Sequence, residues 1–76
     1  MEIRYRTKDL GEAGALLAKG FRLVGLDKEA DFYWFVIEGS NPGEISNAYW
    51  SGDLVVSAKV YYDNLRSLKD RLFSRR

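Results

Sequence analysis

The segment from Asp31 to Glu38 constrains the fold of this chain more than any other. It reads Asp-Phe-Tyr-Trp-Phe-Val-Ile-Glu, with six consecutive aromatic or β-branched residues between two acids. Successive side chains of a strand point to opposite faces of a sheet, so both faces of this segment are apolar. The pattern predicts a central strand covered on both faces. We expect Phe32, Trp34 and Val36 on one face and Tyr33, Phe35 and Ile37 on the other.

Two further strands are expected beside the central one. In residues 3–8, Ile3, Tyr5 and Thr7 alternate with Arg4, Arg6 and Lys8. This period of two predicts a strand with one buried face and one basic, solvated face. Residues 21–27 form a third apolar segment, which residues 28–30 would join to the central strand as a hairpin. Its alternation places Phe21 and Leu23 on one face, and Val24 and Leu26 on the other.

The first helix is predicted to begin after Asp9. Asp9, with Glu12 three residues later, has the pattern of a capping box. In this motif the side chain of each of the two residues accepts a hydrogen bond from the backbone amide of the other. Gly20 would end the helix as a C-terminal glycine. Gly14 lies inside the helix at a cost of up to about 1 kcal/mol relative to alanine. We expect that it allows close approach of the helix to the aromatic face of the sheet.

Two more helices are expected in the second half of the chain. Asn41, Pro42 and Glu44 predict an N-cap, a first helical residue and a second capping box, with Gly52 at the helix end. Residues 53–56 would be extended, as a linker or an edge strand. The last helix is expected over residues 58–74 with Ser57 as its N-cap. Its apolar stripe consists of Tyr61, Leu65, Leu68 and Leu72.

These elements predict one α+β domain over residues 1–76 in the order β-α-β-β-α-α. A helical connection favours parallel placement of the first two strands. Inserting the most apolar strand between them gives a three-stranded antiparallel sheet of order 1-3-2, packed with helices. The expected core is Tyr5, Leu17, Leu23, Trp34, Val36, Ile45, Leu65, Leu68 and Leu72.

Composition argues against most catalytic chemistry. The chain has no cysteine and no histidine, so disulfides, zinc thiolate sites and histidine-based acid–base catalysis are excluded. No catalytic or nucleotide-binding motif is present, and we predict a non-catalytic domain without a cofactor or metal. The carboxylates of Asp27, Glu29 and Asp31 would suit a divalent cation, but solvated turn residues are the better interpretation. No signal-peptide or membrane-spanning pattern occurs, and we expect a cytoplasmic protein.

The distribution of charge suggests a nucleic-acid partner. The net charge is +1, but residues 1–8 sum to +2, residues 9–52 to −4 and residues 53–76 to +3. Basic side chains neutralise phosphates, and a patch would form if the last helix ran beside the first strand. The alternative is that charges on the last helix pair with one another. The candidate nucleic-acid-binding residues are Arg4, Arg6, Lys8, Lys69, Arg71, Arg75 and Arg76.

A protein-interaction domain is the second hypothesis. Tyr49, Trp50 and Tyr62 are candidate contact residues, because exposed aromatic side chains are enriched at interfaces. The helical phase of Ile45 and Ala48 directs Tyr49 inward and leaves Trp50 half-buried at the rim. An unpaired strand edge would be the other contact surface. A protein partner or a second copy of the chain is expected on this hypothesis, and no membrane.

Several segments resemble a family of short bacterial and phage proteins that is catalogued only as a domain of unknown function. They are residues 5–10 (Tyr-Arg-Thr-Lys-Asp-Leu), residues 16–21 (Leu-Leu-Ala-Lys-Gly-Phe), the aromatic strand, residues 49–52 (Tyr-Trp-Ser-Gly) and residues 61–69. The resemblance implies a stand-alone domain, often encoded by mobile elements. It implies no catalytic residues. A phage setting would suit a DNA-associated role or a small protein that binds a host or phage enzyme.

Overall fold

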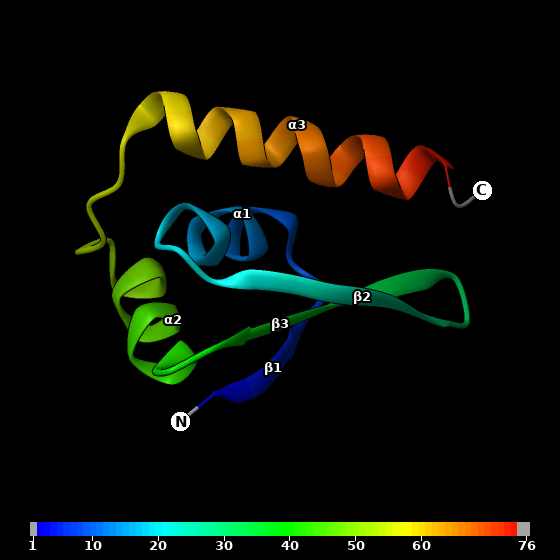
Figure 1. Cartoon of the computed structure of the whole chain (residues 1–76), viewed down its shortest axis with the longest axis horizontal. Helices are drawn as coiled ribbons and strands as arrows, with labels where there is room; N and C mark the ends of the chain where they lie inside the picture. The colour runs from blue at the N-terminus through cyan, green and yellow to red at the C-terminus, as the bar shows by residue number, and fades with distance from the viewer. Residues whose placement is uncertain (1, 75–76) are drawn as a thin grey trace.

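The computed structural model describes residues 2–74, and its elements follow the predicted order (Figure 1). They are β1 (Ile3–Thr7), α1 (Leu10–Ala18), β2 (Arg22–Glu29), β3 (Phe32–Gly39), α2 (Pro42–Ser51) and α3 (Ala58–Ser74). The strands form an antiparallel sheet with β3 between β1 and β2. The α+β class and the strand order 1-3-2 are therefore confirmed.

The helices lie on one side of the sheet (Figure 1). α1 packs on the sheet, α3 packs on α1, and α2 contacts α1 and β1. The buried cluster between these layers consists of Ala13, Leu16, Phe35, Ile37 and Leu68. Within residues 2–74, no helix packs on the opposite face of the sheet. The expectation that both faces of the central strand are covered is thus met by helices on one face only, while on the other face Val36 is buried without a helix.

The core list is right for the residues that face the helices. Leu68 is buried, and the partly buried side chains packed on the core include Tyr5, Leu17, Leu23, Ile45 and Leu72. Leu65 packs against α1 at Gly14. Trp34 and Val36 belong to the opposite face, where Val36 is nonetheless 8% exposed and Trp34 is half-buried. The expectation that Trp34 belongs to the core is therefore wrong.

A β-bulge changes the facing of β2. Leu23 pairs with Ile37 and Leu26 pairs with Phe35, with a register shift between Leu23 and Gly25. The extra residue resets the alternation, so Leu23 and Leu26 both face the helices. The predicted placement on opposite faces is wrong. Strand pairing also continues to residues 29 and 32, so the hairpin turn consists of residues 30–31 in place of 28–30.

Gly14 allows a close approach, but to a helix. A β-carbon at Gly14 would lie 2.7 Å from Cδ2 of Leu65 and 3.4 Å from Cε1 of Tyr61, both on α3. The expectation that this glycine faces the aromatic strand is wrong. It gives α3 close contact with α1, which is consistent with the location of the Tyr61-to-Leu72 stripe.

The helix ends follow the predicted caps in position and only partly in bonding. Oδ2 of Asp9 accepts a hydrogen bond from the Glu12 amide at 2.8 Å, but the Asp9 amide donates to Thr7 Oγ1, so the box does not close through Glu12. Gly20 and Gly52 have φ values of 98° and 84° and end α1 and α2 as predicted. Within the described chain, Asn41 precedes α2 without a side-chain capping bond.

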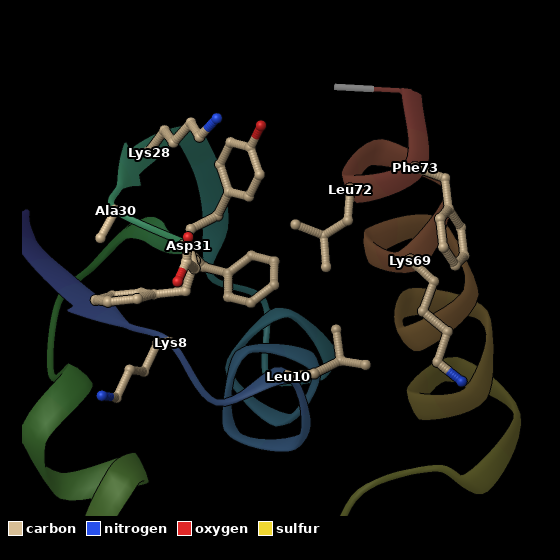
Figure 2. A pocket seen from close by; sticks show the side chains of 11 residues that line it. Lys8, Leu10, Lys28, Ala30, Asp31, Lys69, Leu72 and Phe73 are labelled. Atoms are coloured by element: carbon tan, nitrogen blue, oxygen red, sulfur yellow. The ribbon is translucent and has the colours of Figure 1, made fainter. Parts of the chain in front are cut away.

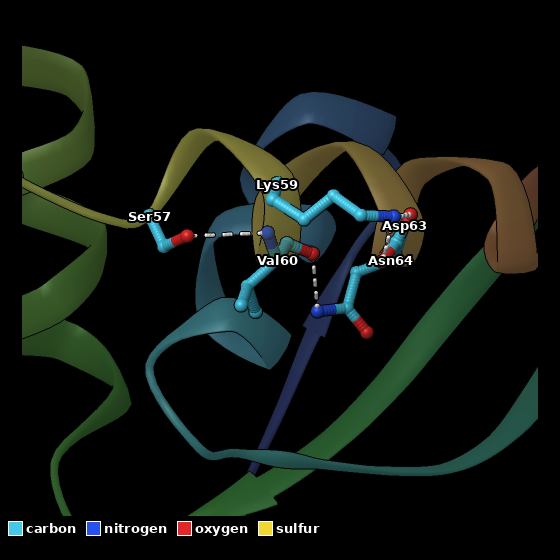
Figure 3. A network of polar contacts seen from close by, with 5 residues as sticks. All are labelled: Ser57, Lys59, Val60, Asp63 and Asn64. Carbon is cyan, nitrogen blue, oxygen red and sulfur yellow. Dashed lines mark hydrogen bonds and ion pairs between the residues drawn. The ribbon is translucent and has the colours of Figure 1, made fainter.

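The start of α3 agrees with the prediction (Figure 3). Oγ of Ser57 accepts a hydrogen bond from the Val60 amide at 3.4 Å, which is the bond of an N-cap. In the first turns of the helix, Lys59 and Asp63 form an exposed ion pair, with Lys59 Nζ 2.9 Å from Asp63 Oδ2. Residues 53–56, between α2 and α3, are a linker and not an edge strand.

Candidate nucleic-acid interface

The sheet face without helices is the surface of greatest functional interest, and we call it the open face. Strand pairing sets Arg4 and Arg22 opposite Glu38, Arg6 opposite Val36, and Asp27 opposite Trp34. The predicted basic face of β1 is thus confirmed as solvent-exposed and lies beside the aromatic side chains of β3. The open face consists of Arg4, Arg6, Lys8, Arg22, Asp27, Glu29, Phe32, Trp34, Val36 and Glu38.

Cationic side chains cover the aromatic rings of the open face. Phe32 and Trp34 pack edge to face with ring centroids 5.6 Å apart. The Arg6 guanidinium carbon lies 4.8 Å from the Trp34 ring centroid, and Lys8 Nζ lies 4.9 Å from that of Phe32. Both distances suit cation–π attraction. Long basic side chains bury their methylene groups on apolar surface, which explains how β3 keeps two aromatic residues here without a covering helix.

Carboxylates partly balance the cations of the open face. Glu38 pairs with both Arg4, at 3.4 Å, and Arg22, and Arg6 Nε lies 4.0 Å from Asp27 Oδ2. The side chains of Arg4 and Arg22 are 66% and 70% exposed, and exposed ion pairs are worth only about 0–1 kcal/mol. The guanidinium groups are therefore accessible to a phosphate, but the Glu38 side chain is only 16% exposed, so the loss of both arginine partners would cost more than an exposed pair.

The basic residues of α3 do not join the open face into one patch. Lys69 and Arg71 lie on α3, and α3 packs on α1 on the covered side of the sheet. Lys8 and Lys69 both contribute to the lining of one groove. Arg75 and Arg76 lie outside the described residues. The sequence-predicted set thus divides into Arg4, Arg6 and Lys8 on the open face and Lys69 and Arg71 on the helix.

The candidate protein-contact residues lie on two helices. Trp50, on α2, is 62% exposed, more than the half-burial expected for it. Its ring packs edge to face on the half-buried Tyr49 ring, with centroids 5.0 Å apart. Tyr62 is on α3 and is 57% exposed. The Arg66 guanidinium carbon lies 5.8 Å from its ring centroid.

A buried carboxylate is the polar feature that the sequence did not reveal. Glu12 is 3% exposed and accepts hydrogen bonds from Tyr5 Oη and Thr7 Oγ1, both at 2.6 Å, and from Ser46 Oγ. Burial raises the pKa of Glu12, but these hydrogen bonds outweigh burial and leave its pKa below the ordinary value. Burial and Glu12 raise the pKa of Tyr5, so its hydroxyl stays a donor.

The Glu12 cluster joins β1, α1 and α2 and has a structural role. Alternation in β1 did indicate that Tyr5 and Thr7 face inward, next to the start of α1. Ser46 lies 34 residues from Glu12, and no local pattern marks it as a partner. A glutamate in a capping box is normally expected at the exposed start of a helix. The sequence therefore did not indicate that Glu12 is buried.

A metal site and a membrane span find no support in the described chain. Among residues 2–74, no group of three potential metal-ligating side chains comes together. Asp27 instead contacts Arg6, and Glu29 accepts a hydrogen bond from the Trp34 indole. No helix within those residues is long and apolar enough to cross a bilayer.

No protein-family model, curated protein or solved structure matches this chain. The resemblance to the bacterial and phage family of unknown function stays a prediction. The function of this chain must therefore be inferred from the chemistry of its surfaces.

Proposed function

We propose that this chain is a non-catalytic binding domain that holds single-stranded nucleic acid on its open face. The observation that carries the proposal is the set of aromatic rings with cations on a helix-free sheet: Trp34 with Arg6, and Phe32 with Lys8. Proteins that bind single strands without sequence preference combine basic side chains with aromatic stacking surfaces. A single strand exposes the faces of its bases, whereas a duplex hides them, which favours the single strand.

Binding would exchange contacts that the open face already makes. Arg6 would move from the Trp34 ring to a phosphate, and a base would take its place on the indole. Each stacked base is worth about 1–3 kcal/mol, more than the exposed contact it replaces. Arg4 and Arg22 would turn from Glu38 to neighbouring phosphates. The carboxylate remains nearby and keeps the affinity modest.

The salt dependence follows from the number of phosphates. About three contacts give a slope of log affinity against log salt near −2 for a single strand, hence about a twentyfold loss between 50 and 200 mM salt. The same contacts on duplex DNA would give a slope near −3 and about a fortyfold loss. Single-strand binding should therefore be less sensitive to salt than duplex binding, and base stacking should make it tighter.

Fluorescence anisotropy with labelled single- and double-stranded DNA and RNA at low salt tests the proposal. The double variant Arg4→Glu with Arg6→Glu should abolish binding. The matched variant Lys69→Glu with Arg71→Glu makes the same charge change on α3 and should retain most of the affinity. Absence of binding to every probe at tens of micromolar protein would overturn the proposal. So would loss of binding in the α3 variant alone.

A protein-interaction role is the second candidate, and the exposure of Trp50 favours it. An indole that is 62% exposed beside Tyr49 has the character of an interface anchor. Affinity capture from the source cells would test it. Suppose that one protein is captured in stoichiometric amount, that its capture survives nuclease treatment, and that Trp50→Ala abolishes the capture. This result would support a protein-interaction role over nucleic-acid binding.

A further inference from the structure

A groove of about 620 Å³ lies between the β2–β3 hairpin end and the C-terminal part of α3 (Figure 2). Its volume is within the roughly 300–1,000 Å³ range of small-molecule sites. The open face contributes Lys8 and Phe32 to one rim, but the groove itself is on the covered side of the sheet, next to the core. It is therefore a second surface, distinct in chemistry from the proposed nucleic-acid interface.

The groove follows from the lengths of the elements. Pairing of β1 with β3 ends at Thr7 and Phe35, while β3 and β2 continue together to Phe32 and Glu29. The end of the β2–β3 hairpin thus extends beyond β1. The C-terminal part of α3 extends in the same direction and faces the hairpin end (Figure 1). Figure 2 shows Leu72 directed from α3 toward the hairpin and Leu10 directed from α1 toward α3. With Phe35, these side chains form an apolar floor.

The rim of the groove is basic. Lys28 stands on the hairpin and Lys69 on α3, on opposite sides of the opening, and Lys8 lies at the β1 end (Figure 2). Asp31 is the acidic residue of the lining, so the charges sum to +2. Among residues 2–74, none of these lysines has a carboxylate partner. An apolar floor beneath unneutralised ammonium groups is complementary to one class of ligand.

We propose that this groove binds a small amphipathic anion, with an aliphatic or aromatic body on the floor and a single carboxylate at the lysines. Burial of the body on Leu10, Phe35 and Leu72 would supply affinity. Lys28 and Lys69 would select for negative charge over a neutral or cationic head group. The ligand need not touch Arg4 or Arg6, whereas Lys8 and Phe32 belong both to the groove rim and to the open face.

Titration with decanoate, followed by ¹H–¹⁵N NMR on the full chain, tests this site. Shifts should be confined to residues of the groove, and the affinity should fall as salt is added. Decan-1-ol and decylammonium carry the same body with neutral and positive heads, and acetate carries the charge without the body. We expect all three to bind at least about tenfold more weakly than decanoate, by the affinity relation.

Charge-reversal variants separate the groove from general charge. Lys28→Glu with Lys69→Glu should weaken decanoate binding about tenfold or more while the circular dichroism melt is retained, because both residues are exposed. Lys19→Glu, an exposed lysine away from the groove, should leave binding unchanged. The proposal is overturned if decan-1-ol binds as tightly as decanoate, if the shifts map elsewhere, or if nothing binds at millimolar ligand. It is also overturned if the groove residues shift with protein concentration alone, which would identify a dimer contact.

Discussion

The substitution Glu12→Gln tests whether the buried carboxylate holds the two halves of the fold together. Its Oε2 accepts hydrogen bonds from Tyr5 and Ser46, and its Oε1 accepts one from Thr7. Glutamine replaces one acceptor oxygen with an amide donor, so at least one hydroxyl must rotate or lose its partner. The shape of the side chain is otherwise conserved, which limits the change to charge and hydrogen bonding.

The expected cost is large for a domain of this size. Hydrogen bonds to a charged group contribute about 1.5–3 kcal/mol each, and since the three share one carboxylate we expect a loss of about 2–3 kcal/mol. A chain of 76 residues has an expected free energy of unfolding of about 4–11 kcal/mol. The melting temperature should fall by about 10–20 °C. Urea melts of both proteins at pH 7 measure the difference directly.

The pH dependence distinguishes a charged from a neutral cluster. The pKa of Glu12 is lower in the folded than in the unfolded protein, so its ionisation stabilises the fold above the unfolded pKa of about 4.3. That contribution is lost as the pH falls through the folded pKa. The stability difference between the parent and Glu12→Gln should therefore be full at pH 7 and shrink below about pH 4.

Glu2→Gln is the matched control, because Glu2 is exposed. It should change the free energy of unfolding by less than about 0.5 kcal/mol. A Glu12→Gln difference below that size at pH 7 would refute the reasoning. A difference that grows as the pH falls would refute the assigned direction of the pKa shift.

Three further substitutions test the packing by denaturant melts. Ser57→Ala removes the cap of α3 and should cost about 1 kcal/mol; an unchanged melt would mean that the Val60 amide finds another acceptor. Phe35→Asp places a charge at a side chain that is 2% exposed and should unfold the domain, and a parental melt would contradict the assigned core. Gly14→Ala gains helix propensity but drives a methyl group to 2.7 Å from Leu65, so we expect net destabilisation of about 1 kcal/mol or more; stabilisation would show that α3 yields easily.

Local sequence patterns predicted the elements and their order, because caps, glycine stops and alternation act within a few residues. The start of α3 at Ser57 and the ends of α1 and α2 are of this kind. The central position of β3 also followed, since its lack of internal charge distinguishes it from its neighbours. These signals do not depend on tertiary context.

The facing of side chains was harder to predict, because it depends on contacts far apart in the chain. The bulge after Leu23 reversed the face of Leu26 without a sequence signal that we could interpret. Trp34 has the polarity of a core residue, yet Arg6 and Glu29 complete its surroundings on the open face. Gly14 indicated a close approach but not its partner.

Only the part of the candidate site that depends on a local pattern could be predicted. The basic face of β1 follows from the alternation of Arg4, Arg6 and Lys8. The aromatic residues of the site could be recognised only from the structure, because it shows that the helices leave one sheet face open. The helix half of the predicted patch depended on the position of α3, which no local pattern determines, and the structure places Lys69 and Arg71 on the other side of the sheet.

Quenching of Trp34 by a single-stranded oligonucleotide tests the central claim most directly. The chain has two tryptophans, so Trp50→Phe leaves Trp34 as the only indole. Titration of this variant with oligothymidylate should quench its emission to saturation, with an affinity that falls about twentyfold between 50 and 200 mM salt. The reciprocal variant Trp34→Phe should show little quenching. Binding that leaves Trp34 emission unchanged, or quenching only in the variant that keeps Trp50, would contradict nucleic-acid binding on the open face.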